Sequence, residues 1–363
     1  MKICIIAGAR PNFMKISPLI RAITNYKEIK YILVHTGQHY DYEMSDTFFK
    51  ELEIPEPDFF LNSGSGSHAK QTADIMLNFE NVCISEKPDI VVVVGDVNST
   101  LAAAIVAKKL GIKVAHVEAG LRSFDMSMPE EINRIVTDSI SDYFFTTEKT
   151  ADKNLVKEGK PENKIFFVGH VMIDNLLHQK KKLSNMKEEK WEDFKQKHRD
   201  YFFMTLHRPS NVDKKETLNE IFDALNTIAE ETPFIFPVHP RTRKKIDEFG
   251  IQISDRIIQI KPLGFKKSLY LWKDARAVFT DSGGLQEETT GLGVPCFTIR
   301  DNTERPVTIE EGTNTLVGNL KSNILDAYDN LKRGNIKTGQ IPELWDGKSA
   351  ERIIDILWKN QKK

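Results

Sequence analysis

Short apolar runs rich in Val, Ile and Phe recur along the chain, and segments of helical length separate them. The clearest runs are residues 2–7, 31–35, 90–94, 113–117, 143–146, 165–168, 202–206, 234–238, 257–260, 277–280 and 295–299. Helical patterns lie between them, as at residues 99–110, 131–140, 151–159, 215–230 and 286–292. Strands that alternate with helices predict an α/β fold with parallel sheets that are covered on both faces.

A charged segment divides the two sets of strands. Residues 179–200 are rich in Lys and Glu and poor in apolar side chains, which indicates an exposed helix and a linker. The 363 residues are enough for two domains. We therefore expect two Rossmann-like domains, at residues 1–175 and 201–345, that face each other across a cleft. Residues 176–200 form the linker, and residues 346–363 form an amphipathic helix that packs back towards the N-terminal domain.

Composition excludes several classes of protein. The 51 basic and 52 acidic side chains nearly cancel, so the overall charge attracts neither nucleic acid nor an anionic membrane. There is no apolar stretch of membrane-spanning length and no signal-like start, so we expect a cytoplasmic protein. Cys4, Cys83 and Cys296 are far apart, which favours buried packing over a disulfide or a metal site.

Ligands of such folds bind at the carboxyl ends of the strands, so the loops there are the place to look for chemistry. The loop after the first strand, residues 8–11, lacks the GxGxxG fingerprint of dinucleotide-binding proteins. Its Arg10 offers a guanidinium fork suited to phosphate, although a surface ion pair is an equally simple role. Lys15 follows one turn into the next helix.

Three carboxylates occupy the corresponding side of the first domain. Asp96 and Glu118 each follow a predicted strand, and Glu130 opens a predicted helix. Each acid alone could serve as a helix cap or a dipole partner. Together they indicate a site in which grouped carboxylates divide the duties of acid and base.

The second domain adds cations and a turn suited to anions. His207, His239 and Arg241 follow its first two strands. The sequence TDSGGLQEE joins a strand to a helix, and the backbone N–H groups of Ser282, Gly283 and Gly284 there predict an anion site. Glu288, one turn later, could accept both hydroxyls of a ribose. Arg300 and Arg305 follow the next strand.

The motifs GARPNFMK, HTGQHYD, GDVNST, HVEAGLRS, PEEINR, LHRPSN, HPRT, TDSGGLQEE and RDNTERP occur in this order between residue 8 and residue 306. In this order they resemble the non-hydrolysing UDP-N-acetylglucosamine 2-epimerases, and the resemblance runs from residue 1 to about residue 318. It implies the GT-B fold and the interconversion of UDP-GlcNAc and UDP-ManNAc.

The resemblance also implies roles for individual residues. The catalytic candidates are Asp96, Glu118, Glu130 and His207. The candidates for binding the UDP-sugar are Arg10, Lys15, His239, Arg241, Ser282, Gly283, Gly284, Glu288 and Arg305. The implied reaction removes UDP to give 2-acetamidoglucal and adds it back, which needs neither a metal ion nor a redox cofactor. A homodimer that serves cell-surface polysaccharide synthesis is implied as well.

Two alternatives stay open at this point. The GLRSF and MPEEINR segments also resemble relatives that epimerise UDP-2,3-diacetamido-2,3-dideoxy-glucuronate. A hydrolysing relative, which releases the sugar from UDP, is the second alternative.

Overall fold

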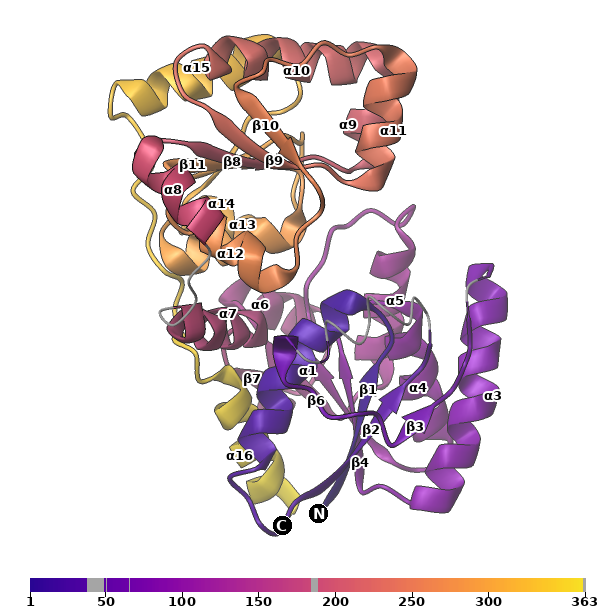
Figure 1. Ribbon diagram of the computed structural model, residues 1–363. Helices are drawn as coiled ribbons and strands as arrows, with labels where there is room; N and C mark the ends of the chain where they lie inside the picture. Colours follow the sequence, from indigo (N-terminus) through magenta and orange to yellow (C-terminus); the bar gives the residue numbers. More distant parts are fainter. Residues whose placement is uncertain (38–48, 50, 65, 184–188, 362–363) are drawn as a thin grey trace. The chain divides into compact units, whose positions relative to one another are not determined.

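The computed structural model describes residues 1–37, 49, 51–64, 66–183 and 189–361, without the side chains of Arg10, Glu189 and Lys190. The chain divides into two compact units (Figure 1). The first unit comprises Met1–Leu177 and Glu343–Lys363, and the second comprises His178–Pro342. Most of the HTGQHYD motif lies outside the described residues.

The first unit is built on a seven-stranded parallel sheet with the order β3-β2-β1-β4-β5-β6-β7. Its strands are β1 (Lys2–Ala7), β2 (Lys30–His35), β3 (Phe59–Phe60), β4 (Ile90–Val94), β5 (Lys113–Val117), β6 (Tyr143–Thr146) and β7 (Ile165–Phe167). Its helices are α1 (Arg10–Ile23), α3 (His68–Glu86), α4 (Asn98–Lys109), α5 (Pro129–Ile140), α6 (Lys149–Lys157) and α16 (Ser349–Gln361), with the short turn η1 (Glu162–Lys164).

The second unit is built on a six-stranded parallel sheet with the order β10-β9-β8-β11-β12-β13. Its strands are β8 (Phe202–Thr205), β9 (Phe234–Pro237), β10 (Ile257–Ile260), β11 (Ala277–Thr280), β12 (Cys296–Thr298) and β13 (Asn314–Leu316). Its helices are α8 (Glu189–Lys197), α9 (Pro209–Val212), α10 (Lys215–Ala229), α11 (Pro240–Phe249), α12 (Phe265–Trp272), α13 (Gly283–Leu292), α14 (Pro306–Glu310) and α15 (Lys321–Lys332). Helix α7 (Val171–Leu183) joins the two units.

Both sheets have the doubly wound order of a Rossmann fold, so the predicted α/β class with two Rossmann-like domains is confirmed. The order reverses between β1 and β4 in the first unit and between β8 and β11 in the second. These two switch points are where such folds bind their ligands.

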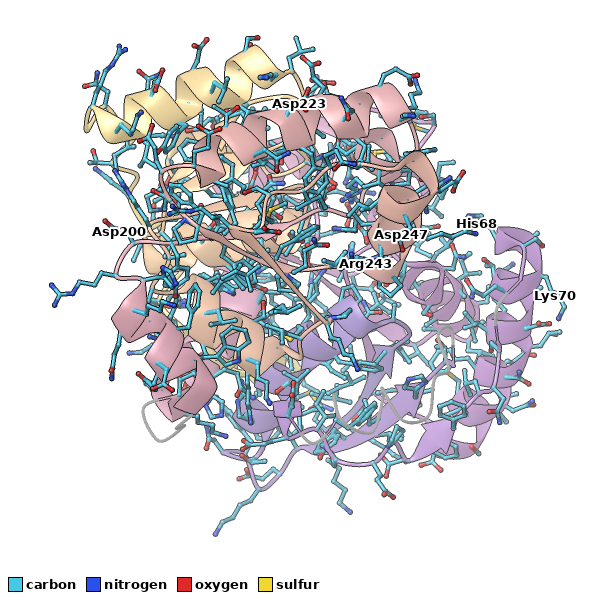
Figure 2. The ribbon with its side chains drawn as sticks, turned by 45° about the horizontal axis from the view of Figure 1, so that its top comes forward. His68, Lys70, Asp200, Asp223, Arg243 and Asp247 are labelled. Carbon is cyan, nitrogen blue, oxygen red and sulfur yellow. The ribbon has the colours of Figure 1, made fainter. Side chains whose placement is uncertain are left out.

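The strands are apolar because both faces of each sheet are covered. All five residues of β4 are buried, as the run of Ile and Val predicts. In the second unit, the rings of Phe202, Phe234 and Phe279 lie within 5.3 Å of one another by their centroids. Charged side chains such as Asp223 and Asp247 point outward from α10 and α11 (Figure 2).

Several boundaries differ from those expected. The short strands β3 and β13 were not predicted, because two or three residues are too few to show a period. The charged segment contains helical residues, as expected, since α7 continues to Leu183 and α8 follows. The chain returns to the first unit at Glu343, and α16 packs on α1 there, with the rings of Tyr26 and Trp358 6.4 Å apart.

The three cysteines are buried, as predicted. None of the described helices combines the length and the apolar character needed to cross a lipid bilayer.

Candidate functional site

The loops at the switch point of the first unit are held together by Asn12. Its Oδ1 accepts hydrogen bonds from the N–H groups of Gly8 and Ala9, at 3.2 and 2.9 Å. Its Nδ2 donates to the carbonyl of Val94 at 3.0 Å. One side chain at the start of α1 therefore fixes the loop after β1 against the end of β4.

A buried ion pair between Lys15 and Glu118 lies at the same edge of the sheet. The two side chains are 6% and 1% exposed. Glu118 has a φ of 73°, and its N–H donates to the carbonyl of Phe145 at 2.9 Å. A left-handed backbone costs a residue other than glycine about 1–3 kcal/mol, and such strain is concentrated at functional sites. Lys15, which was expected to contact the nucleotide, pairs with a catalytic candidate in this structure.

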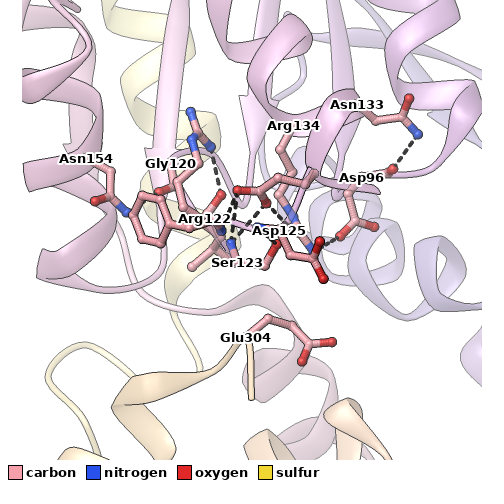
Figure 3. A network of polar contacts seen from close by, with 12 residues as sticks. Asp96, Gly120, Arg122, Ser123, Asp125, Asn133, Arg134, Asn154 and Glu304 are labelled. Atoms are coloured by element: carbon pink, nitrogen blue, oxygen red, sulfur yellow. Dashed lines mark hydrogen bonds and ion pairs between the residues drawn. The ribbon is translucent and has the colours of Figure 1, made fainter. Parts of the chain in front are cut away.

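Asp96 follows β4 and is held by helix α5 (Figure 3). Its Oδ2 lies 2.6 Å from Nη2 of Arg134, and its carbonyl accepts a hydrogen bond from Nδ2 of Asn133 at 2.8 Å. The Asp96 side chain remains 21% exposed. An acid fixed in this way can reach a ligand while its own orientation is set by the helix.

Glu130 and Glu131 have different environments although they are neighbours. Glu131 is buried, pairs with Nη1 of Arg134 at 2.8 Å, and accepts hydrogen bonds from the N–H groups of Ser123 and Phe124. Burial raises the pKa of Glu131, but these contacts outweigh burial and the net pKa is lowered. Glu130 is exposed, and among the described residues no hydrogen bond or ion pair links it to Asp96 or Glu118.

The switch point of the second unit places His207 against Asp281. Nδ1 of His207 lies 2.9 Å from Oδ1 of Asp281. The same carboxylate accepts hydrogen bonds from the backbone N–H groups of His207 and Arg208 and from Nδ2 of Asn211. Burial raises the pKa of Asp281, yet His207 and the backbone N–H groups lower it on balance. The contact with Nδ1 leaves Nε2 of His207 for another partner.

His239 and Arg241 follow the neighbouring strand β9. The rings of His207 and His239 lie 5.8 Å apart, and Nδ1 of His239 accepts a hydrogen bond from the N–H of Arg241. Burial and then the neighbouring His207 lower the pKa of His239. Arg241 forms a two-pronged ion pair with Asp213, with its Nε 2.9 Å from Oδ1.

The predicted anion site lies at the start of helix α13, with one correction. The N–H of Ser282 is not free, because it donates to the hydroxyl of Thr280 at 2.9 Å. Gly283 and Gly284 begin the helix, where backbone N–H groups have no partner within the helix. A Cβ at Gly283 would meet no atom within 4 Å, so the approach to this turn is open.

Two acids further along α13 differ in their partners. Glu287 pairs with Nε of Arg305 at 2.5 Å, so Arg305 reaches this helix rather than solvent. Glu288 is buried, and burial together with the charge of Glu287 raises its pKa to about 8. A carboxyl group with such a pKa is protonated at neutral pH unless a ligand donates hydrogen bonds to it.

Sequence reasoning missed the residues that position the predicted ones. Asn12, Glu131, Arg134 and Asp281 all make the contacts described above. Asp281 had a detectable signal, since it follows an apolar strand as Asp96 does. Arg134 had a weaker one, its spacing of three residues from Glu131 on one helix. The side chain of Arg10 is outside the described part of the structure.

Comparisons with known proteins agree on one family. The family model described as UDP-N-acetylglucosamine 2-epimerase matches residues 21–358. A UDP-N-acetylglucosamine 2-epimerase of Methanocaldococcus jannaschii is 46% identical over 98% of this chain and 99% of its own. A UDP-2,3-diacetamido-2,3-dideoxy-D-glucuronate 2-epimerase of Pseudomonas aeruginosa is 40% identical, over 99% of this chain and 100% of its own.

The solved structures give the same result. The M. jannaschii enzyme in complex with UDP-GlcNAc and UDP superimposes with a TM-score of 0.87 at 46% identity, over 99% of this chain and 100% of that one. The two doubly wound sheets are those expected of the GT-B fold. This chain therefore belongs to the UDP-N-acetylglucosamine 2-epimerase family of isomerases.

Proposed function

We propose that this protein interconverts UDP-GlcNAc and UDP-ManNAc by eliminating UDP to 2-acetamidoglucal and adding it back. The observation that carries the proposal is the grouping of Asp96 and Glu118 after neighbouring strands, in a chain of this family. Each acid forms an ion pair, Asp96 with Arg134 and Glu118 with Lys15. Two carboxylates in different environments can divide the work of acid and base.

The chemistry explains why such groups are needed. The C2 proton of the sugar is not next to a carbonyl group, so it becomes acidic only as the bond from C1 to UDP begins to break. A base then removes the proton, and protonation from the opposite face inverts C2 when UDP is added back. The reaction requires a clamp for the departing diphosphate and groups that transfer protons at C2.

In this proposal the second unit binds UDP. The N–H groups at the start of α13 hold the diphosphate, helped by the dipole of the helix. Glu288 accepts the ribose hydroxyls, and His239, Arg241 and Arg305 support the nucleotide. His207, fixed by Asp281, supplies a proton-transfer group from this unit. Arg10, Lys15 and Glu130 complete the proposed set from the first unit.

The second candidate substrate is UDP-2,3-diacetamido-2,3-dideoxy-glucuronate. It is favoured by the 40% identity to the P. aeruginosa enzyme named for that substrate. The 46% identity to a UDP-GlcNAc enzyme favours the first candidate.

Product analysis separates these possibilities. The purified protein is incubated with each UDP-sugar, and the nucleotide sugars are separated by anion-exchange chromatography. We expect UDP-GlcNAc to give UDP-ManNAc with the total amount of UDP-sugar unchanged. Turnover of the uronate alone would replace the first candidate by the second, and free UDP with free ManNAc would indicate a hydrolysing enzyme.

A further inference from the structure

A buried histidine, His116, lies beneath the loops that carry Asp96 and Glu118, two of the catalytic candidates of the first unit. It belongs to β5 and has no exposed surface. Its Nε2 lies 2.8 Å from the carbonyl oxygen of Gly95, and its Nδ1 lies 2.6 Å from Oδ1 of Asp138 on α5. The reaction proposed above assigns no role to either side chain.

The partners of His116 determine its protonation. A carbonyl oxygen can only accept, so Nε2 must carry a proton to bond Gly95. Asp138 accepts hydrogen bonds through its other oxygen from the N–H of Gly120 at 3.1 Å and pairs with Nη2 of Arg122 at 2.8 Å. Burial raises the pKa of Asp138, but His116 and Arg122 outweigh burial and lower it. An oxygen that faces both the N–H of Gly120 and the guanidinium of Arg122 acts as an acceptor, which identifies Asp138 as a carboxylate. Nδ1 of His116 must therefore carry a proton as well.

The charges in this cluster are balanced. Arg122 also binds Glu158 through Nε and Nη2, at 2.8 and 2.6 Å. Two cations, His116 and Arg122, therefore face two carboxylates, Asp138 and Glu158. His116, Arg122 and Asp138 are buried, whereas Glu158 is partly exposed. Buried charges need such pairing, and removing one of the buried partners leaves another uncompensated.

The cluster contacts both of the loops that carry Asp96 and Glu118, which we call the catalytic loops. Gly95, whose carbonyl His116 holds, immediately precedes Asp96 and has a φ of 66°. Gly120, whose N–H Asp138 holds, follows Glu118 by two residues. The N–H of Gly95 also donates to the carbonyl of Val117 at 3.0 Å. Rotation of the peptide after Gly95 would move Asp96 relative to Glu118.

The structure assigns to His116 the role of a positioning residue: held as an imidazolium by Asp138, it fixes the Gly95 carbonyl and thereby sets Asp96 against Glu118 for proton transfer. The assignment rests on the proposed epimerase function. It predicts a loss of turnover with little change in substrate affinity, since misplacing a catalytic group by about 1 Å can cost about 10²-fold in rate.

The test compares four variants with the wild type by kcat and KM for UDP-GlcNAc, by exchange of the C2 proton, and by thermal melting. In His116→Gln and Asp138→Asn one charge of the pair is removed, and we expect kcat to fall about 10- to 100-fold with KM within about threefold. In the double variant two neutral amides replace the charged pair. The Gln side chain can donate to the carbonyl of Gly95 and accept a hydrogen bond from the Asn side chain. We expect it to recover much of the lost kcat.

The matched control is Asp142→Asn. Asp142 accepts a hydrogen bond from the N–H of Val114 and pairs with Lys108, at the opposite end of β5. Like Asp138, it binds a backbone N–H and a cation, but it lies away from the loops of Asp96 and Glu118, so we expect wild-type kcat from it. An equal loss of kcat in this control, or no recovery in the double variant, would overturn the positioning role.

A measurement on the wild type covers the case in which a variant fails to fold. With ¹⁵N-labelled histidine, NMR should detect the buried imidazole of His116 with a proton on both nitrogens. A neutral tautomer for His116 would overturn the assignment whatever the activity. If the wild type does not exchange its C2 proton, the epimerase function is overturned, and the inference with it. If the wild type and the folded single variants exchange the proton at the same rate, the inference alone is overturned.

Discussion

The single buried side chain of Asp281 holds several groups of the candidate site in the second unit. It accepts hydrogen bonds from two backbone N–H groups and from Asn211, and it also holds Nδ1 of His207. Its carboxylate therefore fixes both the loop after β8 and the tautomer of the histidine. His207 and the carboxylate that orients it are 74 positions apart in the sequence.

Replacing Asp281 by Asn tests this orientation. An amide can donate to Nδ1, which would place the proton of His207 on Nε2 and remove the carboxylate that stabilises an imidazolium. We expect kcat to fall by about 10²-fold or more, as loss of the orienting acid does in other histidine systems. The control is Asp274→Asn, which loses ion pairs with Lys195 and Lys273 ahead of β11. Steady-state kinetics that showed equal kcat in both variants would contradict the role of Asp281.

The raised pKa of Glu288 predicts that the stability of the folded protein depends on pH. Its pKa is raised from 4.5 to about 8 by burial and by Glu287. Because the folded-state pKa lies above the ordinary value, the stability that this group contributes is present below about pH 4.5 and is lost as the pH rises through about 8. The free energy of unfolding should therefore fall more between pH 5 and pH 8 in the wild type than in Glu288→Gln, as measured by urea denaturation.

The same group should release a proton when UDP binds. If the ribose hydroxyls donate to Glu288, the bound state needs the carboxylate, so the proton held at pH 7 must leave. Titration calorimetry in two buffers of different ionisation enthalpy measures that proton. A wild type that releases no more protons than Glu288→Gln would rule out the ribose contact.

At the scale of elements, the start of helix α13 carries the proposed diphosphate site. Gly283→Ala adds a methyl group where no atom lies within 4 Å, and alanine favours the helix. We expect an unchanged or higher melting temperature but at least about tenfold weaker UDP binding, because the methyl group would block the close approach of the phosphate.

Gly293→Ala is the matched control at the other end of the same helix. Gly293 has a φ of 73° in the C-cap, so its replacement should lower the melting temperature and leave UDP affinity unchanged. Equal UDP affinities for Gly283→Ala and the wild type in calorimetry would show that the phosphate does not approach this turn.

Much of the element order could be predicted because buried parallel strands have a distinctive composition. The run of residues 90–94 specified β4 by its Ile and Val alone. Helix starts were harder to predict, since α5 and α13 begin two and three residues before the predicted helical patterns at residues 131–140 and 286–292. Strand-end loops identified Asp96, Glu118 and His207 as candidates. Their partners could not be predicted, because Arg134, Lys15 and Asp281 reach them from other elements.

At the scale of the whole molecule, the first unit is closed by the end of the chain. Both carboxylate oxygens of Asp174 accept backbone hydrogen bonds from the start of α16, from Ser349 at 3.1 Å and Ala350 at 2.7 Å. The indole N–H of Trp345 donates to the carbonyl of Thr147 at 3.1 Å. The first domain is therefore discontinuous in sequence, and we expect its folding to require residues that follow the second unit.

A chain that ends at Pro342 tests this dependence. The loss of α16 removes Ile353, Ile354 and Leu357, which are at most 3% exposed. Burying one such side chain contributes about 1.5–3 kcal/mol, so their sum is a large part of the stability of a typical domain. We expect the truncated protein to aggregate or to melt at a much lower temperature. Calorimetry that gave an unchanged melting profile would show that the first unit is complete without this segment.

The central claim is that the protein inverts C2 of UDP-GlcNAc through an eliminated intermediate. Proton NMR of the purified protein with UDP-GlcNAc in deuterated water tests it directly. We predict that deuterium enters C2 while the signals of UDP-ManNAc grow. UDP-ManNAc that forms with its C2 proton retained would contradict elimination and re-addition, and an untouched UDP-GlcNAc signal would contradict the assigned substrate.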